Sequence, residues 1–426
     1  MADIINLKLK SRCSCGFSST KDAEKAREEL RQILYKAPKP QLHLHLDGSL
    51  SFTFIQEAIQ RYRIKHPECK NENDMFFDQG DWEPKNHQEL REWLMGLKSA
   101  RIAERSAVQK NSNWKVFDFC NQFLQTGEDL KLMTCRLVNS LYEKHRVNYI
   151  EIRFAPVLHT LNGLTEQEAV FYATQGFRDA VDQLKKRGIE VHGGLILCAL
   201  RSYSIAKAFE TLELCVNNKK ADGGLVLGFD IAGDEGAYPL AIFTEVLRKA
   251  KAQKMPVTVH TGEWNEKNNP VIIDNLKLAC EIGVDRIGHG LALRSCDQEL
   301  LDEYRRKEIA IEVCLTSNCA NPTKCKSFKE HPISMFLAEQ LNVTGLNTDN
   351  LLLSGNLIIG APDPTNECVR ALLDCCISPV QLLQVIKHGY ECGFAKPSEE
   401  FINTVVREWT TVFIPKIENC LKSNNI

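Results

Sequence analysis

Two histidines lie two residues apart in the apolar stretch Gln41 to Leu50, which reads QLHLHLDGSL. A β-strand directs residues i and i+2 to the same face, so His43 and His45 would point to one place. Imidazole is the commonest protein ligand for divalent metals such as zinc. The stretch is short and lies between Lys39-Pro40 and Asp47-Gly48, which favours a buried strand over a helix. Two hydrogen-bonded core histidines would give the same pattern, so the metal hypothesis depends on the rest of the chain.

Further residues with suitable chemistry stand at the ends of later apolar stretches. Each alone has an ordinary explanation, such as a strand-end hydrogen bond, a solvated loop acid or a helix cap. Their joint occurrence at successive strand ends is what these explanations do not cover. The residues are His260 with Glu263, His289, Asp349 with Asn350, and Gly233.

The elements that must position these residues alternate along the chain. Strictly alternating strands and helices build parallel sheets, and eight such units match a closed (β/α)8 TIM-type barrel better than an open α/β sheet. No glycine-rich dinucleotide or phosphate motif follows any strand, which also disfavours the open sheet. A capping box at 165–168 predicts one helix start, and residues 117–146 have a continuous helical pattern. The predicted strands lie within 41–50, 149–154, 191–199, 225–231, 257–260, 286–290, 309–314 and 343–349.

The predicted barrel domain covers residues 37–426. Three regions of the chain lie outside its regular alternation of strands and helices. Residues 1–36 are a polar N-terminal extension with a helical pattern over 21–35. Residues 65–115 interrupt the alternation after strand one with prolines, asparagines and apolar clusters. So long a segment is typical of a lid or binding loop, although a surface elaboration would fit as well. After residue 353 the pattern is helical and would cover the outside of the barrel.

The composition is that of an ordinary globular protein, with 43% hydrophobic residues and a net charge of −2. We find neither a basic field for nucleic acid nor a membrane span, and the N-terminus lacks a secretory signal pattern. A cytosolic protein with neither nucleic acid nor membrane as partner is therefore expected. The 17 cysteines form no CxxC pair and predict mainly buried thiols, with a metal site at Cys13 and Cys15 or at Cys319 and Cys325 as the alternative. The number of subunits stays open, a monomer being one option.

A metal held by three histidines and one aspartate keeps a position open for water, as hydrolysis requires. The metal would lower the pKa of that water toward neutrality. A binuclear site would need a bridging carboxylate or lysine midway round the barrel. The third and fourth strands end in Leu200-Arg201 and Gly233-Asp234 without a lysine, so we expect one metal ion per chain.

Six motifs together resemble the signature set of the adenosine deaminase family, which includes metal-dependent adenosine and AMP deaminase-like amidohydrolases. The motifs occur in family order over about residues 38–350, and the set is specific although each motif alone is weak. They are His-Leu-His-Leu-Asp-Gly (43–48), Asp-Ile-Ala-Gly-Asp-Glu (230–235), His-Thr-Gly-Glu (260–263), Arg-Ile-Gly-His-Gly (286–290), Thr-Ser-Asn (316–318) and Leu-Asn-Thr-Asp (346–349).

The resemblance implies a role for each predicted site residue. Glu263 would protonate the purine N1, which makes C6 electrophilic, and His289 would orient or deprotonate the attacking water, after which ammonia leaves. Asp47 would face the ribose 5′-hydroxyl, and the backbone N–H of Gly233 would face the ring N3. The implied ligands of one zinc ion are His43, His45, His260 and Asp349.

One position departs from the family pattern. The family usually has a second aspartate after the last metal ligand, whose carboxyl group contacts purine N7, and this chain has Asn350 there. An amide can donate a hydrogen bond to N7 but cannot hold or lose a proton. We therefore predict retained deamination with an altered affinity or substrate range.

The main functional prediction is zinc-dependent hydrolytic deamination of adenosine and 2′-deoxyadenosine to inosine and ammonia. An alternative is a deaminase of a related aminopurine, N6-substituted or in nucleotide form, because residues 65–115 leave the ribose side undefined. A catalytically weak purine-binding relative is a second alternative. A different metal-dependent amidohydrolase that acts on a cyclic amide is a third.

Overall fold

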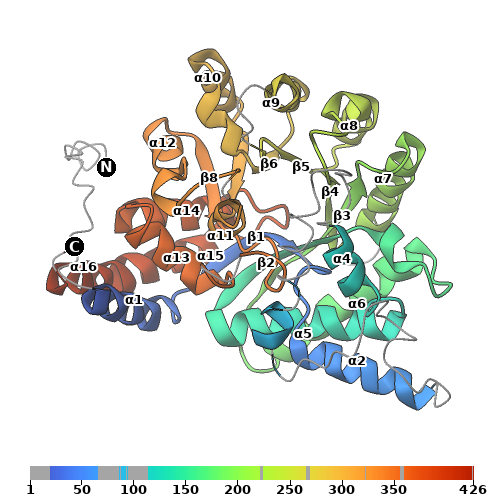
Figure 1. Cartoon of the computed structure of the whole chain (residues 1–426), viewed down its shortest axis with the longest axis horizontal. Coiled ribbons are helices and arrows are strands. Elements are labelled where there is room, and N and C mark those ends of the chain that lie inside the picture. Colours follow the sequence, from blue (N-terminus) through green and yellow to red (C-terminus); the bar gives the residue numbers. More distant parts are fainter. Residues whose placement is uncertain are drawn as a thin grey trace.

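The computed structural model describes residues 20–65, 86, 88–92, 94, 114–220, 224–264, 269–321, 323–355, 359–424 and 426. Over these residues, eight parallel strands form one sheet in the order β1 to β8, and helices surround it (Figure 1). An isolated parallel bridge between Leu44 and Asp349 brings the end of the sheet back to the first strand. The chain therefore folds as the (β/α)8 barrel that the alternating sequence predicts.

The strands are short and almost completely buried. Helices cover the outer face of such a barrel and packed side chains fill its inside, which explains why these stretches are apolar on both faces. The strands are β1 (Lys39–His45), β2 (Val147–Phe154), β3 (His192–Leu200), β4 (Val226–Ala232), β5 (Val257–Thr261), β6 (Arg286–His289), β7 (Ala310–Val313) and β8 (Asn342–Leu346).

Side-chain caps start several of the helices between the strands, among them α5 (Gly127–His145), α6 (Glu166–Lys185), α9 (Pro270–Ile282) and α10 (Gln298–Arg306). The side chain of Thr165 accepts the N–H of Glu168, and the Glu168 carboxylate accepts the N–H of Thr165, so the predicted capping box is present. Both bonds satisfy N–H groups at the start of the helix. The other helices are α2 (Phe52–Lys65), α4 (Trp114–Asn121), α7 (Ile205–Lys220), α8 (Thr244–Ala252), α11 (Leu315–Cys319) and α12 (Ile333–Ala338).

Residues 117–146 form two helices, so the prediction of one continuous helix is wrong. α4 ends at Asn121 and α5 begins at Gly127. Thr126 has an extended backbone, and its side chain accepts the N–H of Asp129 at 3.2 Å. A threonine N-cap starts a new helix in this way, and the apolar periodicity carries no signal of it.

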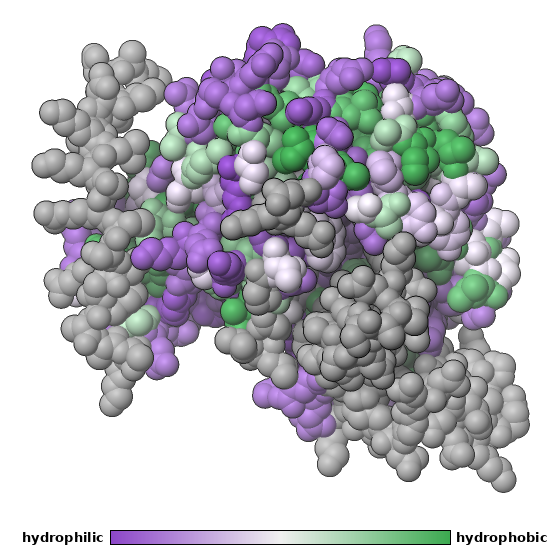
Figure 2. Space-filling view, turned by 45° about the horizontal axis from the view of Figure 1, so that its top comes forward, coloured by the Kyte–Doolittle hydropathy of each residue, from purple (hydrophilic) through white to green (hydrophobic). Residues whose placement is uncertain are grey.

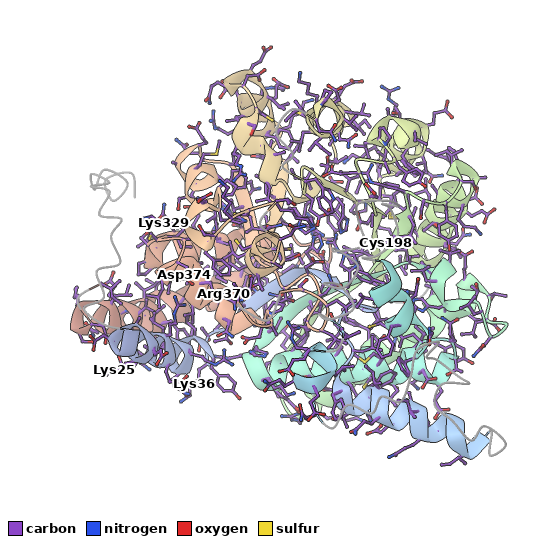
Figure 3. The ribbon with its side chains drawn as sticks, viewed as in Figure 1. Lys25, Lys36, Cys198, Lys329, Arg370 and Asp374 are labelled. Carbon is purple, nitrogen blue, oxygen red and sulfur yellow. The ribbon has the colours of Figure 1, made fainter. Side chains whose placement is uncertain are left out.

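After β8 the chain is helical, as predicted, and runs through α13 (Pro364–Leu373), α14 (Pro379–Glu391), α15 (Glu399–Glu408) and α16 (Ile414–Ser423). The N-terminal helix α1 (Thr20–Leu34) packs against α13 and α16, so segments from both ends of the chain lie side by side (Figure 1). Arg27 of α1 donates to the carboxylate of Asp374, at 3.0 Å in one of two contacts. Asp374 is labelled in Figure 3. The predicted lid, residues 65–115, lies largely outside the described residues.

Side chains complete the seam between β1 and β8. The Gln41 amide donates to the carbonyl of Leu346 at 2.7 Å and accepts the N–H of Thr348 at 3.0 Å. Asn347 accepts the N–H of Leu42 at 2.8 Å. These amides replace the backbone bonds of a regular strand pair and so hold the end of β1 beside the residues that follow β8.

The face of the molecule shown in Figure 2 mixes hydrophilic and hydrophobic residues. In the part of the chain that the structure describes, no helix has both the length and the apolar character needed to cross a membrane. The cysteines of that part are free thiols. Most of them are buried, as predicted, including Cys120, Cys198, Cys280 and Cys314.

Candidate active site

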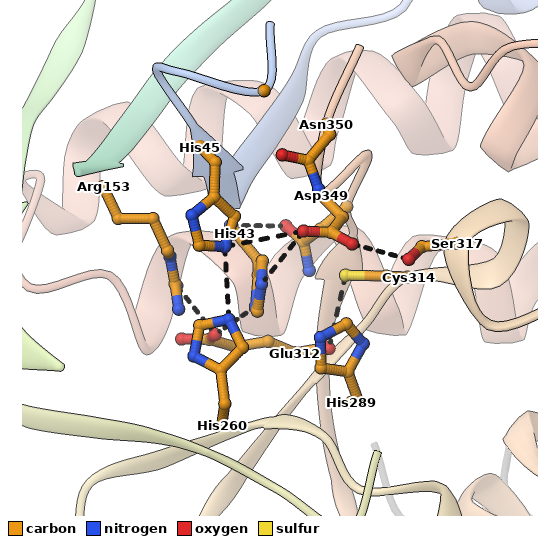
Figure 4. Close-up of polar contacts among 12 residues, drawn as sticks. His43, His45, Arg153, His260, His289, Glu312, Cys314, Ser317, Asp349 and Asn350 are labelled. Atoms are coloured by element: carbon orange, nitrogen blue, oxygen red, sulfur yellow. Dashed lines mark hydrogen bonds and ion pairs between the residues drawn. The ribbon is translucent and has the colours of Figure 1, made fainter. Parts of the chain in front are cut away.

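Four histidines and one aspartate gather at the carboxyl ends of β1, β5, β6 and β8 (Figure 4). The Nε2 atoms of His45 and His260 lie 3.2 Å apart. Asp349 Oδ1 lies 3.5 Å from Nε2 of His45 and 3.6 Å from Nε2 of His43. The ring centroids of His43 and His289 are 4.8 Å apart. The structure thus brings together the four residues predicted as metal ligands and places His289 beside them.

The outer nitrogens of two of these histidines contact buried carboxylates. His43 Nδ1 lies 2.8 Å from Glu312 Oε2, and His260 Nδ1 lies 3.2 Å from Asp230 Oδ1. Each Nδ1 therefore carries the hydrogen, and the lone pair of each Nε2 faces the common point. His43 Nε2 is buried and has no hydrogen-bond partner among the described residues. An unpartnered imidazole nitrogen beside two further nitrogens and a carboxylate fits a divalent metal such as zinc.

A buried arginine links the two carboxylates. Arg153 donates to Glu312 at 2.8 Å (Figure 4). It also donates to Asp230 at 3.0 Å. Arg286 donates to Glu312 at 2.7 Å. Burial would raise the pKa of Glu312, but these two guanidinium groups and His43 hold it well below its ordinary value. The carboxylate is therefore ionised and able to accept the Nδ1–H of His43.

Two residues at the ends of strands have a left-handed backbone, with φ of 68° at His289 and 60° at Asp349. Such a conformation is uncommon for residues other than glycine and costs of order 1–3 kcal/mol. Helix α11 helps to hold both side chains, since Ser317 donates to Asp349 Oδ2 at 2.5 Å and Asn318 Nδ2 lies 3.0 Å from His289 Nδ1. The strained backbone turns both side chains into the site.

Glu263 is held at both its backbone and its side chain. The carboxylate of Glu235 accepts the N–H groups of three successive residues, those of Gly262, Glu263 and Trp264, at 2.9, 2.8 and 3.1 Å. Lys324 forms an ion pair with Glu263 Oε1, and its Nζ lies 4.1 Å from the centre of the Trp264 ring. Burial would raise the pKa of Glu263, but Lys324 and His289 lower it to about 2. Glu263 is therefore a carboxylate at neutral pH.

The residues predicted to bind substrate lie around the same barrel end. Asp47 is buried after β1, and burial raises its pKa to about 7. Gly233 follows β4 with φ of 110°, a backbone conformation open to glycine. Asn350 follows Asp349 and donates through Nδ2 to Ser354 at 3.3 Å. Gly48 gives the Asn350 amide its space, because a Cβ at position 48 would lie 1.5 Å from Asn350 Oδ1.

A family profile described as adenosine deaminase matches residues 38–363. The chain belongs to the adenosine deaminase family. It is 30% identical over 380 residues to the adenosine deaminase of Clostridium kluyveri, a match that covers 89% of this chain and 95% of that protein. The chain is therefore a hydrolytic deaminase of adenosine-like substrates, as the motif resemblance predicts.

Solved structures of other deaminases and amidohydrolases share the barrel. An N6-mAMP deaminase from Arabidopsis superposes with a TM-score of 0.69 at 18% identity and covers 89% of this chain and 100% of that one. An amidohydrolase from Burkholderia ambifaria with bound Zn superposes with a TM-score of 0.67 at 19% identity and covers 93% and 94% of the two chains. At these identities the structures establish a common fold.

Several residues that support the site of this adenosine deaminase family member received no role from the sequence. The sequence does carry a signal for some of them. A charged residue inside an apolar strand must find a partner within the barrel, so its position there indicates a buried ion pair or hydrogen bond. Lys324 carried no such signal, since it stands in a loop with other lysines. The residues without a predicted role are Arg153, Asp230, Glu235, Glu312, Ser317, Asn318 and Lys324.

Proposed function

We propose that this chain catalyses the zinc-dependent hydrolytic deamination of adenosine and 2′-deoxyadenosine to inosine and ammonia. The observation that carries the proposal is the convergence of three imidazole nitrogens and one carboxylate oxygen on a single point, with His43 Nε2 buried and unpartnered among the described residues. Glu263 and His289 border that point, with His289 Nε2 3.9 Å from Glu263 Oε1. A purine C6 placed there would meet a nucleophile on one side and an acid–base group at N1.

One zinc ion would be held by His43, His45, His260 and Asp349. When bound, the ion lowers the pKa of water, so that a nucleophile is available near neutral pH. Two ligands are already oriented before the ion binds, because Glu312 and Asp230 hold the rings of His43 and His260 in place. The Burkholderia ambifaria amidohydrolase with bound Zn supports the choice of metal.

Glu263 supplies the proton path. Lys324 engages its Oε1 atom, which leaves Oε2 for the substrate. As the carboxylate is ionised, it can accept the proton that water loses when its oxygen bonds to C6, and it can deliver that proton to N1. The second water proton remains on the C6 hydroxyl group and passes to the exocyclic amine as the bond between C6 and that nitrogen breaks. Ammonia leaves, the oxygen becomes the carbonyl of inosine, and no external acid is needed.

The ribose side favours a nucleoside over a nucleotide. Burial raises the pKa of Asp47 to about 7, and in its ionised form Asp47 would accept a hydrogen bond from the 5′-hydroxyl and repel a phosphate. Within the described residues, the charged group that acts on Asp47 is the like-charged carboxylate of Asp349, and no lysine or arginine pairs with it. A nucleotide or an N6-substituted purine is the second candidate substrate, because the Arabidopsis structural relatives are an N6-mAMP deaminase and a protein complexed with IMP.

A substrate panel with zinc analysis tests the proposal. The purified chain should contain one zinc ion and convert adenosine and 2′-deoxyadenosine, followed by the loss of adenosine absorbance, faster than AMP or N6-methyl-AMP. Preference for either nucleotide would replace the nucleoside assignment by the second candidate. A zinc-loaded protein that turns over no aminopurine would contradict deamination and leave a purine-binding relative.

A further inference from the structure

His289 stands at one end of a chain of buried hydrogen bonds that reaches a backbone amide. His331 Nδ1 lies 3.2 Å from the backbone nitrogen of Ile333. His331 Nε2 lies 3.1 Å from Asn318 Oδ1, and Asn318 Nδ2 lies 3.0 Å from His289 Nδ1. The side chains of His289, Asn318 and His331 are all buried. Water therefore does not compete for these bonds.

The backbone N–H of Ile333 sets the direction of every bond in this chain. A backbone N–H can donate only, so His331 Nδ1 must accept. Burial lowers the pKa of His331 to about 3, so the ring is neutral and its single hydrogen sits on Nε2. That hydrogen requires an acceptor, which is Asn318 Oδ1. The amide orientation of Asn318 is thereby decided, since the opposite orientation would place two donors face to face.

The last bond decides the tautomer of His289. The Asn318 amide turns its Nδ2 hydrogens toward His289, so His289 Nδ1 accepts and carries no hydrogen. The hydrogen of the neutral ring is then on Nε2, the atom that faces Glu263 Oε1 at 3.9 Å. A donor facing a carboxylate is the favourable arrangement, and two acceptors at that distance would repel each other.

We infer that Asn318 and His331 are positioning residues that hold His289 as the Nε2–H tautomer, so that His289 donates a hydrogen bond to the attacking water and does not take its proton. The inference rests on the proposed function for the identity of the nucleophile. With its single lone pair occupied by Asn318, His289 has no site for a further proton. The proton released as the water oxygen bonds to C6 goes to the Glu263 carboxylate and then to N1. His289 orients the water through the whole step.

Nitrogen-15 NMR of the zinc-loaded, histidine-labelled enzyme observes the tautomer without reference to activity. The His289 signals, assigned by their loss in His289→Ala, should show an unprotonated Nδ1 and a protonated Nε2. In Asn318→Asp, the carboxylate can only accept, so the hydrogen should move to Nδ1. Turnover of adenosine by that variant should fall about a hundredfold, the usual loss when one donor to the reacting oxygen is removed.

A pair of substitutions at His331 separates positioning from packing. The amide nitrogen of a glutamine reaches as far as Nε2 of histidine, whereas that of an asparagine reaches only as far as Nδ1. His331→Gln should therefore keep the His289 tautomer and most of kcat, and His331→Asn should lose both, with zinc content unchanged in each. Lys329→Gln, at an exposed residue of the same segment, is the control (Figure 3).

Three results would overturn the inference. They are a protonated Nδ1 at His289 in the unaltered enzyme, an unchanged tautomer in Asn318→Asp, and equal kcat values for the two His331 variants. The NMR result is independent of turnover. An enzyme that shows the expected tautomer but deaminates no purine would therefore contradict the proposed function and the assigned nucleophile, and the hydrogen-bond chain itself would stand.

Discussion

At the scale of single residues, Glu263 has both a low pKa and a position restrained by its neighbours. Its backbone is bound by Glu235 and its Oε1 atom by Lys324, so one carboxylate oxygen is free to face a ring nitrogen. Residues held in this way keep a reacting group within the narrow range of positions that a proton transfer needs. The ion pair with Glu263 explains why Lys324 can lie in a nearly buried place.

Glu263→Gln should retain zinc and lose most of the turnover of adenosine. An amide can neither accept the proton of water nor deliver one to N1, and the loss of such a group lowers kcat by about 10² to 10⁴. The measurements are metal content by mass spectrometry and the loss of adenosine absorbance. Unaltered turnover would remove Glu263 from the proton path.

Glu312→Gln should weaken zinc binding without removing a ligand. The neutral amide holds the Nδ1–H of His43 less strongly than the carboxylate and leaves Arg153 and Arg286 poorly balanced. Removal of such a supporting partner lowers metal affinity by about 10- to 100-fold. Competition with a chelator of known affinity measures the change, and an unchanged Kd would show that Glu312 serves the barrel interior alone.

Asn350→Asp should raise the turnover of adenosine, because a carboxyl group can hold a proton and donate it to N7. The position is accessible to this change, since Asn350 Oδ1 has no hydrogen-bond partner among the described residues. Steady-state kinetics with adenosine and with N6-substituted purines measure the effect. A large loss with adenosine would show instead that the asparagine suits a different purine.

At the scale of elements, the strand ends were predictable because alternation fixes both the strands and the barrel edge at which they end. His43, His260 and Asp349 could therefore be placed together from the sequence. The break between α4 and α5 could not, because apolar residues continue across it and the cap rests on one threonine. Lys324 could not be placed either, since a loop has no periodicity from which to infer direction.

Asn347→Ala should destabilise the barrel at the seam between β1 and β8. The substitution leaves the buried N–H of Leu42 without its acceptor, which costs about 1–3 kcal/mol. Denaturant unfolding measures the free energy of unfolding, and Asn217→Ala, at an exposed residue of α7, should change it by about 0.5 kcal/mol or less. Equal stability of the two variants would show that the seam depends on its backbone bonds.

At the scale of the whole molecule, the proposed ligands come from β1, β5 and Asp349, in the segment that follows β8. Chelation of zinc should therefore lower global stability and not only activity. With zinc at a hundred times its Kd, binding to the native state contributes about 2.7 kcal/mol. Thermal unfolding with and without chelator measures the difference, and a metal-independent midpoint would argue against a zinc ion at this place.

The seam between β1 and β8, which the side chains of Gln41 and Asn347 complete, has a further consequence for how the protein matures. His43 and His45 are synthesised about three hundred residues before Asp349, and the seam joins them only after the eighth strand has been added. A nascent or truncated chain that lacks this strand has only part of the donor set. Acquisition of the ion would then report that the eighth strand has been added and that the ring has closed, and shorter products would stay metal-free and open to proteolysis.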